Sequence, residues 1–249
     1  MKVYEAVLDQ LLGAGLTHFA GMVGSTSAPY ASALAAQNQA RYVGIRHEQV
    51  AAAILDATAR LTGQPGCLMV HGGSGLLAAS LGIGSAALDC TPMVVLSATQ
   101  ERKAMENGWW QTLDVQKPVA DFVKFQTRVE RPDQAVAAVR DALRESVSGK
   151  PGVAQIDIPI DVSTEELGTD NVPKPVRVAT PHIRSFPDPT LVEEAAKLLR
   201  EAERPVLLIG GGANYSGAGT ALIQLAERMG APVVNSPTSR GVLPESNPL

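Results

Sequence analysis

The stretch GIRHEQVAAAILDATARLTGQPG, residues 44–66, joins a short apolar run to a helix and places an acid, Glu48, at the junction. Apolar residues recur at helical spacing after Glu48, and Gly63 followed by Pro65 is typical of a helix C-terminus. The sequence therefore predicts a helix over 48–63 that begins with a carboxyl group. An acid in a first turn is ordinary because the helix dipole stabilises it, so its position alone favours a structural role.

The alternation of apolar run, loop and helix continues on both sides of this stretch. Predicted strands cover 16–24, 40–46, 66–73, 91–99, 122–130 and 152–162, and predicted helices cover 2–13, 28–37, 75–89 and 132–149. Most of the strands are continuously apolar, which indicates that both faces are buried. We therefore expect the α/β class, with a doubly wound parallel sheet.

Ligands of such sheets bind beyond the carboxyl ends of the strands, where the connecting loops converge. Four loops should therefore share one site, namely 21–27, 45–49, 70–76 and 97–111.

A Pro-rich stretch then interrupts the pattern, after which the alternation of helix and strand restarts. The predicted organisation is a first domain over 1–165, a linker over 166–189 and the beginning of a second, Rossmann-like α/β domain over 190–249. Two strands and two helices are too few for an independent sheet domain. We therefore expect the second domain to be incomplete, either because the sequence is a fragment or because a partner chain completes it.

Composition excludes several classes of protein. The formal net charge of -4 argues against nucleic-acid binding. The first residues lack the apolar core of a signal peptide, and no apolar run reaches the ~18 residues of a membrane span. Cys67 and Cys90 form no CxxC pair. The prediction is a cytoplasmic protein with reduced thiols that binds no membrane.

Three further motifs leave alternatives open. HGGSG, residues 71–75, lacks the spacing of a nucleophile elbow and is interpreted as a loop that lets backbone approach a ligand, although an oxyanion-hole loop is the alternative. IGGGANYSGAG, residues 209–219, meets the dinucleotide pattern only loosely, so FAD or ADP binding there is a weak prediction. Trp109 and Trp110 mark either a lid or interface, or a packed loop anchor.

The order of the motifs resembles the N-terminal pyrimidine-binding domain of thiamine-diphosphate enzymes of the acetolactate synthase and pyruvate decarboxylase type. The resemblance runs through LLGAGLTHFAGMVGS (11–25), RHEQVAAAILDATARLTGQPG (46–66), HGGSGLLA (71–78), CTPMVVLSA (90–98), GWWQTLD (108–114) and GVAQIDIPIDV (152–162). RPVLLIGGGA (204–213) and RGVLPESNPL (240–249) resemble the start of the family's central domain.

The resemblance implies a role for Glu48 as the catalytic carboxyl that hydrogen-bonds the aminopyrimidine ring of thiamine diphosphate. It also implies two groups of neighbouring residues. The cofactor side would hold Glu48, Gly73, Ser74, Gly75 and Gln111, and the substrate side would hold Val23, Gly24, Ser25, His71 and Gln111.

The sequence departs from the family pattern at several of these positions. Ser74 replaces the proline of the family's Gly-Pro-Gly turn, Ala78 replaces an asparagine, Thr58 replaces a tyrosine and Val23 replaces a proline. The substrate therefore cannot be carried over from the family, and a redirected substrate and a partly degenerate copy both remain open.

The sequence contains no Gly-Asp-Gly motif, which in the family holds the diphosphate and its Mg²⁺. We therefore expect no metal ligands in this chain, and no 2-oxo-acid decarboxylase activity from the chain alone. The resemblance implies a homodimer or higher oligomer, or a partner chain with the diphosphate domain. The hypothesis is a 2-oxo-acid decarboxylase or carboligase; the alternatives are a non-catalytic fragment of that fold and a protein that binds flavin or ADP.

Overall fold

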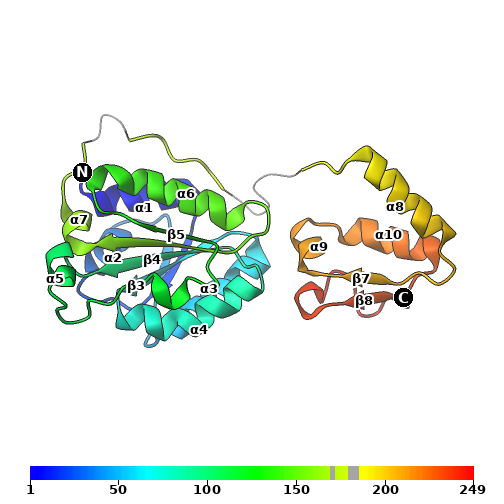
Figure 1. Cartoon of the computed structure of the whole chain (residues 1–249), viewed down its shortest axis with the longest axis horizontal. Coiled ribbons are helices and arrows are strands. Elements are labelled where there is room, and N and C mark those ends of the chain that lie inside the picture. The colour runs from blue at the N-terminus through cyan, green and yellow to red at the C-terminus, as the bar shows by residue number, and fades with distance from the viewer. Residues whose placement is uncertain (169–171, 179–184) are drawn as a thin grey trace. The chain divides into compact units, whose positions relative to one another are not determined.

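The computed structural model describes residues 1–168, 172–178 and 185–249, which form two units, Met1–His182 and Ile183–Leu249. Residues 169–171 and 179–184 of the predicted linker lie outside the described residues. Each unit contains its own parallel sheet with helices packed on it (Figure 1), as the α/β pattern of the sequence predicts.

The first unit is built on a six-stranded parallel sheet in the order β2-β1-β3-β4-β6-β5. The strands are β1 (His18–Gly21), β2 (Arg41–Gly44), β3 (Gly66–His71), β4 (Met93–Thr99), β5 (Phe125–Arg128) and β6 (Val153–Pro159). Every residue of β3, β4 and β6 is buried. The mainly apolar sequence of these strands therefore does correspond to burial on both faces, although β6 also buries Gln155 and Asp157.

Helices cover both faces of this sheet (Figure 1). One face carries α1 (Val3–Gly13), α2 (Ala28–Ala35) and α6 (Ala135–Val147), and the other carries α3 (Glu48–Thr62) and α4 (Ser74–Leu88). The predicted doubly wound sheet is thus confirmed. The helices α3 and α4 approach closely because α4 has a glycine at the contact: a Cβ added to Gly82 would lie 2.6 Å from the Cβ of Ala52.

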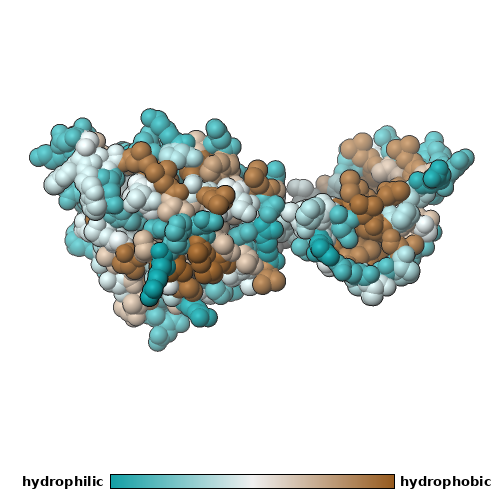
Figure 2. Space-filling view, turned by 90° about the horizontal axis from the view of Figure 1, so that it is seen from below, coloured by the Kyte–Doolittle hydropathy of each residue, from teal (hydrophilic) through white to brown (hydrophobic). Residues whose placement is uncertain are grey.

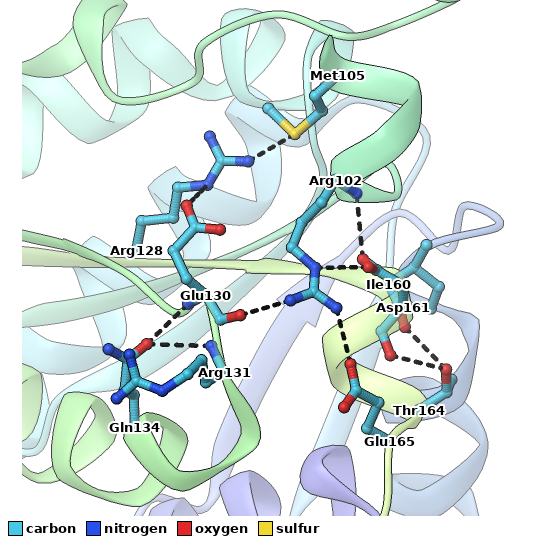
Figure 3. A network of polar contacts seen from close by, with 10 residues as sticks. All are labelled: Arg102, Met105, Arg128, Glu130, Arg131, Gln134, Ile160, Asp161, Thr164 and Glu165. Atoms are coloured by element: carbon cyan, nitrogen blue, oxygen red, sulfur yellow. Dashed lines mark hydrogen bonds and ion pairs between the residues drawn. The ribbon is translucent and has the colours of Figure 1, made fainter. Parts of the chain in front are cut away.

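Two short helices replace structure that the sequence pattern assigns otherwise. The predicted strand over 152–162 ends at Pro159, and α7 (Ile160–Thr164) follows it. The expected irregular loop after β4 contains α5 (Arg102–Glu106). Arg102 joins the two: its Nε donates to Asp161 Oδ2 at 2.7 Å, and its side chain also reaches Glu165 at 2.8 Å (Figure 3). These bonds fix the chain directions at the ends of β4 and β6.

The described part of the linker lies along the first unit. Gln10 Nε2 donates to the Pro173 carbonyl at 2.9 Å, and the Val178 amide donates to the Ala14 carbonyl at 2.9 Å. Val178 itself is buried in the core that α1 shares with the sheet. The segment 172–178 is therefore attached to α1 and its C-terminal end at Pro173 and Val178, although most of its residues are exposed.

The second unit contains α8 (Pro189–Glu201), β7 (Leu207–Ile209), α9 (Gly211–Tyr215), α10 (Gly219–Met229) and β8 (Val233–Asn235). Its sheet has two parallel strands, as predicted, and α9 occupies the glycine-rich turn. Leu208 and Val234 are exposed on these strands. Figure 2, seen from below the view of Figure 1, shows hydrophobic surface on this unit as well as on the first.

Candidate functional site

The four loops that the sequence places at the carboxyl ends of the strands meet around one cavity of about 190 Å³. Its lining comes from loops after β1, β3 and β4 and from the start of α3, and consists of Met22, Val23, Gly24, Ser25, Glu48, His71, Ser74, Trp110 and Gln111. These segments are far apart in the sequence. The parallel sheet brings them together because β1, β3 and β4 are adjacent and end at the same edge.

Glu48 is the first residue of α3 and is only 5% exposed, although it lines the cavity. The preceding residue, His47, caps the helix by accepting a hydrogen bond from the Gln49 amide at 3.3 Å. Among the described residues, none forms a hydrogen bond or ion pair with the Glu48 carboxyl group. A nearly buried carboxyl without a partner, open to a cavity, is able to hydrogen-bond a ligand.

Glycines shape the wall beside Glu48. A Cβ at Gly75 would lie 3.1 Å from Glu48 Oε1, so the glycine leaves the carboxyl its space. Gly73 precedes α4 with φ +74°, and a Cβ there would lie 2.9 Å from the carbonyl oxygen of Gln111. Gly73 and Gly75 are therefore required by conformation and close contact, which agrees with the interpretation of residues 71–75 as a backbone-approach loop.

A chain of hydrogen-bonded polar side chains also lines the cavity. Thr26 Oγ1 donates to the Ala98 carbonyl at 2.5 Å and contacts His71 Nδ1 at 2.7 Å. His71 Nε2 lies 2.5 Å from Gln111 Oε1, and Gln111 Nε2 donates to Ser74 Oγ at 3.1 Å. Loops after β1, β3 and β4 are thereby connected through side chains at the cavity.

The loop that carries Gln111 is held in an unusual backbone conformation, with φ +60° at this residue. Trp109 and Trp110, just before it, are 71% and 69% exposed. Within the first unit these tryptophans are therefore not a packed loop anchor. The alternative prediction, a lid or an interface, stays a prediction. The loop starts from α5, which Arg102 ties to α7 (Figure 3).

The structure brings all the predicted site residues together. Glu48, Ser74 and Gln111 of the cofactor group and Val23, Gly24, Ser25 and His71 of the substrate group line the cavity, with Gly73 and Gly75 directly behind it. Sequence reasoning missed Met22, Trp110 as a lining residue, and Thr26. The only sequence feature that could have indicated Thr26 is its hydroxyl group, two residues after Gly24 in the loop that follows β1.

No cluster of acidic, histidine or cysteine side chains suited to a metal ion occurs in the described ranges. None of the described helices combines the length and hydrophobicity needed to cross a membrane.

Comparison with known proteins identifies the family of the chain. The family model described as the N-terminal TPP-binding domain of thiamine pyrophosphate enzymes matches residues 1–118, and the model of their central domain matches residues 192–249. The chain therefore belongs to the thiamine-pyrophosphate enzyme family.

Individual relatives point the same way. A protein of Methanocaldococcus jannaschii described as an acetolactate synthase large subunit is 32% identical over 251 residues, which are 100% of this chain and 42% of that protein. The 2-hydroxyacyl-CoA lyase 1 of Mus musculus is 33% identical over 217 residues, 87% of this chain and 37% of the lyase.

A solved structure from Mycobacterium smegmatis, described as a thiamin diphosphate-dependent enzyme, superimposes with a TM-score of 0.88 at 27% identity. The match covers 100% of this chain and 47% of that one. The chain thus spans less than half the length of these relatives.

Proposed function

We propose that this chain forms the pyrimidine-binding half of the active site in a thiamine-diphosphate-dependent decarboxylase or carboligase of 2-oxo acids. The observation that carries the proposal is the Glu48 carboxyl, which is buried, open to the cavity and without a hydrogen-bond partner among the described residues. Its surroundings fit a flat ring, because glycines at 73 and 75 keep the adjacent wall free of side chains.

When bound, thiamine diphosphate supplies an electron sink for the bond next to a carbonyl group. In this proposal Glu48 holds the aminopyrimidine ring through a hydrogen bond and exchanges a proton with it. Gly75 keeps the carboxyl in place, Gly73 and Ser74 lie beside the ring, and Gln111 serves both cofactor and substrate. Val23, Gly24, Ser25 and His71 form the substrate side of the cavity.

The diphosphate and its Mg²⁺ need a second set of ligands. The sequence has no Gly-Asp-Gly motif, so we propose that these ligands come from a domain in the same gene product or in a partner chain. Assembly into a homodimer or higher oligomer would then complete the site. The exposed leucines of α4, Leu77, Leu81 and Leu88, give such an assembly an apolar surface.

The test is carbon dioxide release from pyruvate and other 2-oxo acids with thiamine diphosphate and Mg²⁺. The 249-residue chain alone should release none, and the chain supplied with its diphosphate-binding domain should be active. Activity of the chain alone would contradict the half-site. Cofactor binding without any turnover in the completed protein would favour a non-catalytic member of the fold.

Binding of FAD or ADP at residues 209–219 rests on the glycine pattern alone. In the structure α9 occupies this turn. Gly211 packs against Thr238, since a Cβ added to Gly211 would lie 3.0 Å from Thr238 Oγ1. An absorbance spectrum of the purified chain decides the flavin question directly.

A further inference from the structure

His71 is a polar residue at the end of a buried strand, and the proposed function places it on the substrate side of the cavity without giving it a chemical role. It ends β3, is largely buried, and contacts Thr26 on one side and Gln111 on the other. Among the described residues that line the cavity, it is the one side chain able to carry a positive charge. Histidine is also the residue whose ordinary ionisation falls between about pH 5 and 8.

The hydrogen bonds determine which nitrogen of His71 carries a proton. The Thr26 hydroxyl has one hydrogen, and the Ala98 carbonyl, 2.5 Å away, can only accept it. The same hydroxyl oxygen must therefore accept from His71 Nδ1, which lies 2.7 Å away. Nδ1 of His71 is thus protonated whether the ring is neutral or charged.

The other nitrogen, Nε2, faces the side-chain amide of Gln111, and two arrangements satisfy every group. In the charged ring, Nε2–H donates to Gln111 Oε1, and Gln111 Nε2 donates to Ser74 Oγ, which is the arrangement in the structure. In the neutral ring, Nε2 must accept, so the amide turns by half a rotation and its oxygen then accepts from the Ser74 hydroxyl.

The two arrangements present different groups to the cavity. With His71 charged, the oxygen of Ser74 is used as an acceptor and its O–H is free to donate into the cavity. With His71 neutral, the Ser74 O–H is consumed by Gln111 and only lone pairs face the cavity. A proton on His71 therefore adds a positive charge and a hydrogen-bond donor to the same wall.

We propose that His71 is a positioning residue that, through Gln111 and Ser74, prepares the cavity for the carboxylate of a small anionic substrate. The proposal rests on the proposed function, since a 2-oxo acid carries a carboxylate next to the reacting carbonyl. It assigns recognition of that carboxylate to the Ser74 hydroxyl and to the charge of His71 behind it. The consequence is that binding of the anion and protonation of His71 favour each other.

Other ionisable groups near His71 also influence whether its ring is charged. Glu48 of α3 lines the same cavity, and Glu101, next to α5, lines a neighbouring cavity that shares Ser25 and Trp110 with it. Cys67 lies on the same strand as His71, and burial raises the pKa of its thiol, so it stays uncharged. Neither carboxyl group forms a hydrogen bond with His71 in the structure.

The first experiment is NMR spectroscopy of the full chain labelled with ¹⁵N at histidine, which needs no substitution and no cofactor. The neutral form of His71 should carry its proton on Nδ1, and Nε2 should gain a proton as the pH falls. A neutral form with the proton on Nε2 would overturn the proposal. His18, at the opposite end of the sheet on β1, is the internal reference.

The second experiment measures binding of pyruvate, with its uncharged ester methyl pyruvate as the matched probe. Pyruvate affinity should be higher when His71 is charged than when it is neutral, and should therefore fall as the pH rises, because binding of the anion is linked to one proton. Methyl pyruvate should show no such dependence, and it should not shift the His71 signals. An equal pH dependence for both probes would overturn the proposal.

The variant Ser74→Ala should lower pyruvate affinity at low pH by about tenfold, the effect of one hydrogen bond to a charged group. Ser80→Ala on the same helix should leave it unchanged, because Ser80 Oγ donates to the Leu77 carbonyl and does not line the cavity. Equal losses in both variants, or none in either, would contradict the proposal.

Thiamine diphosphate binding is measured separately from these readouts. If the cofactor fails to bind the protein completed with its diphosphate-binding domain, while the tautomer and the pyruvate response are as stated, then the proposed function is wrong and the coupling between His71 and an anion stands. If the cofactor binds and the pyruvate response is independent of pH, the proposed function stands and the role of His71 is wrong.

Discussion

The Oε1 atom of Glu48 lies 3.1 Å from the position that a Cβ atom would occupy at Gly75. The first residue of α3 and the second residue of α4 therefore touch across the cavity wall, and a methyl group between them would press on the carboxyl. The same helix, α4, contains two further glycines in different surroundings, so three Gly→Ala variants separate site effects from folding effects.

Gly75→Ala should disturb the site and leave the fold intact. The added methyl group displaces the end of the Glu48 side chain, and a misplacement of about 1 Å at a reacting group lowers rates by about 10²-fold. Thiamine diphosphate binding and turnover of the completed enzyme are the measurements. The control is Gly84→Ala, whose methyl group meets only Phe122 ring carbons at 3.8 Å or more, and normal binding by Gly75→Ala would show that Glu48 has room to move.

Gly82→Ala should destabilise the first unit by about 1–3 kcal/mol, because the methyl group would lie 2.6 Å from the Cβ of Ala52 and 3.0 Å from the Gln49 carbonyl oxygen. Urea unfolding gives the change in free energy. The double variant Gly82→Ala with Ala52→Gly should recover part of the loss, since it removes one of the two overlaps. Additive effects of the two substitutions on the free energy of unfolding would mean that contact between residues 52 and 82 does not restrict how closely α3 and α4 pack.

Glu48→Gln should abolish cofactor activation while changing the free energy of unfolding by no more than roughly 0.3–1 kcal/mol, the value of a first-turn acid. Loss of a general acid or base lowers rates by about 10²–10⁴-fold. Hydrogen–deuterium exchange at C2 of bound thiamine diphosphate in the completed enzyme is the readout. Glu5→Gln, a first-turn acid of α1, is the control, and equal exchange in wild type and Glu48→Gln would make Glu48 a purely structural residue.

Asp157 should make the first unit less stable as the pH rises. Burial raises the pKa of this carboxyl to about 6, although a hydrogen bond from Thr99 and the nearby Arg128 act in the opposite direction. The unfolded pKa is near 3.8, so the folded state binds the proton more tightly. The destabilisation is absent below about pH 4, grows up to about pH 6 and is constant above it.

Comparison with Asp157→Asn isolates this contribution. Between pH 4 and 7 the unfolding free energy of wild type should fall relative to that of the variant by at most about 3 kcal/mol. Asp9→Asn, at an exposed position of α1, reports the background of the measurement. A difference between Asp157→Asn and wild type that is the same at both pH values would contradict the prediction.

The second unit should exchange its amide hydrogens faster than the first. Val206 and Leu208 are 58% and 76% exposed, whereas every residue of β4 is buried. Amides with few buried side chains around them open at low free energy. Hydrogen exchange of the chain under conditions where it is monomeric should therefore show lower protection for Leu208 than for Leu96, and equal protection would contradict it.

Much of the fold and of the candidate site could be predicted because its signals are local. Continuous apolar runs identify the buried strands, and glycines at 73 and 75 mark the turn where backbone must approach closely. Glu48 is predicted at a helix start because apolar residues recur at helical spacing directly after it. The convergence of four loops followed from the parallel sheet alone.

The remaining features depend on contacts between distant residues. Thr26 orients His71 across 45 positions, and nothing near Thr26 in the sequence indicates that partner. The short helix α7 continues an apolar run, so periodicity extends the strand through it, whereas the structure ends the strand at Pro159 and ties Asp161 to Arg102.

The hydrogen bond from the Val178 amide to the Ala14 carbonyl also has a mechanical consequence. Along the described part of the first unit, Val178 is the last residue that is buried in its core. A pull on the chain from the C-terminal side would first load this attachment on α1, and only afterwards reach β6. The strands that carry the cavity are thereby shielded from tension, and a protein cut at residue 165 would lose this protection together with the cover over α1.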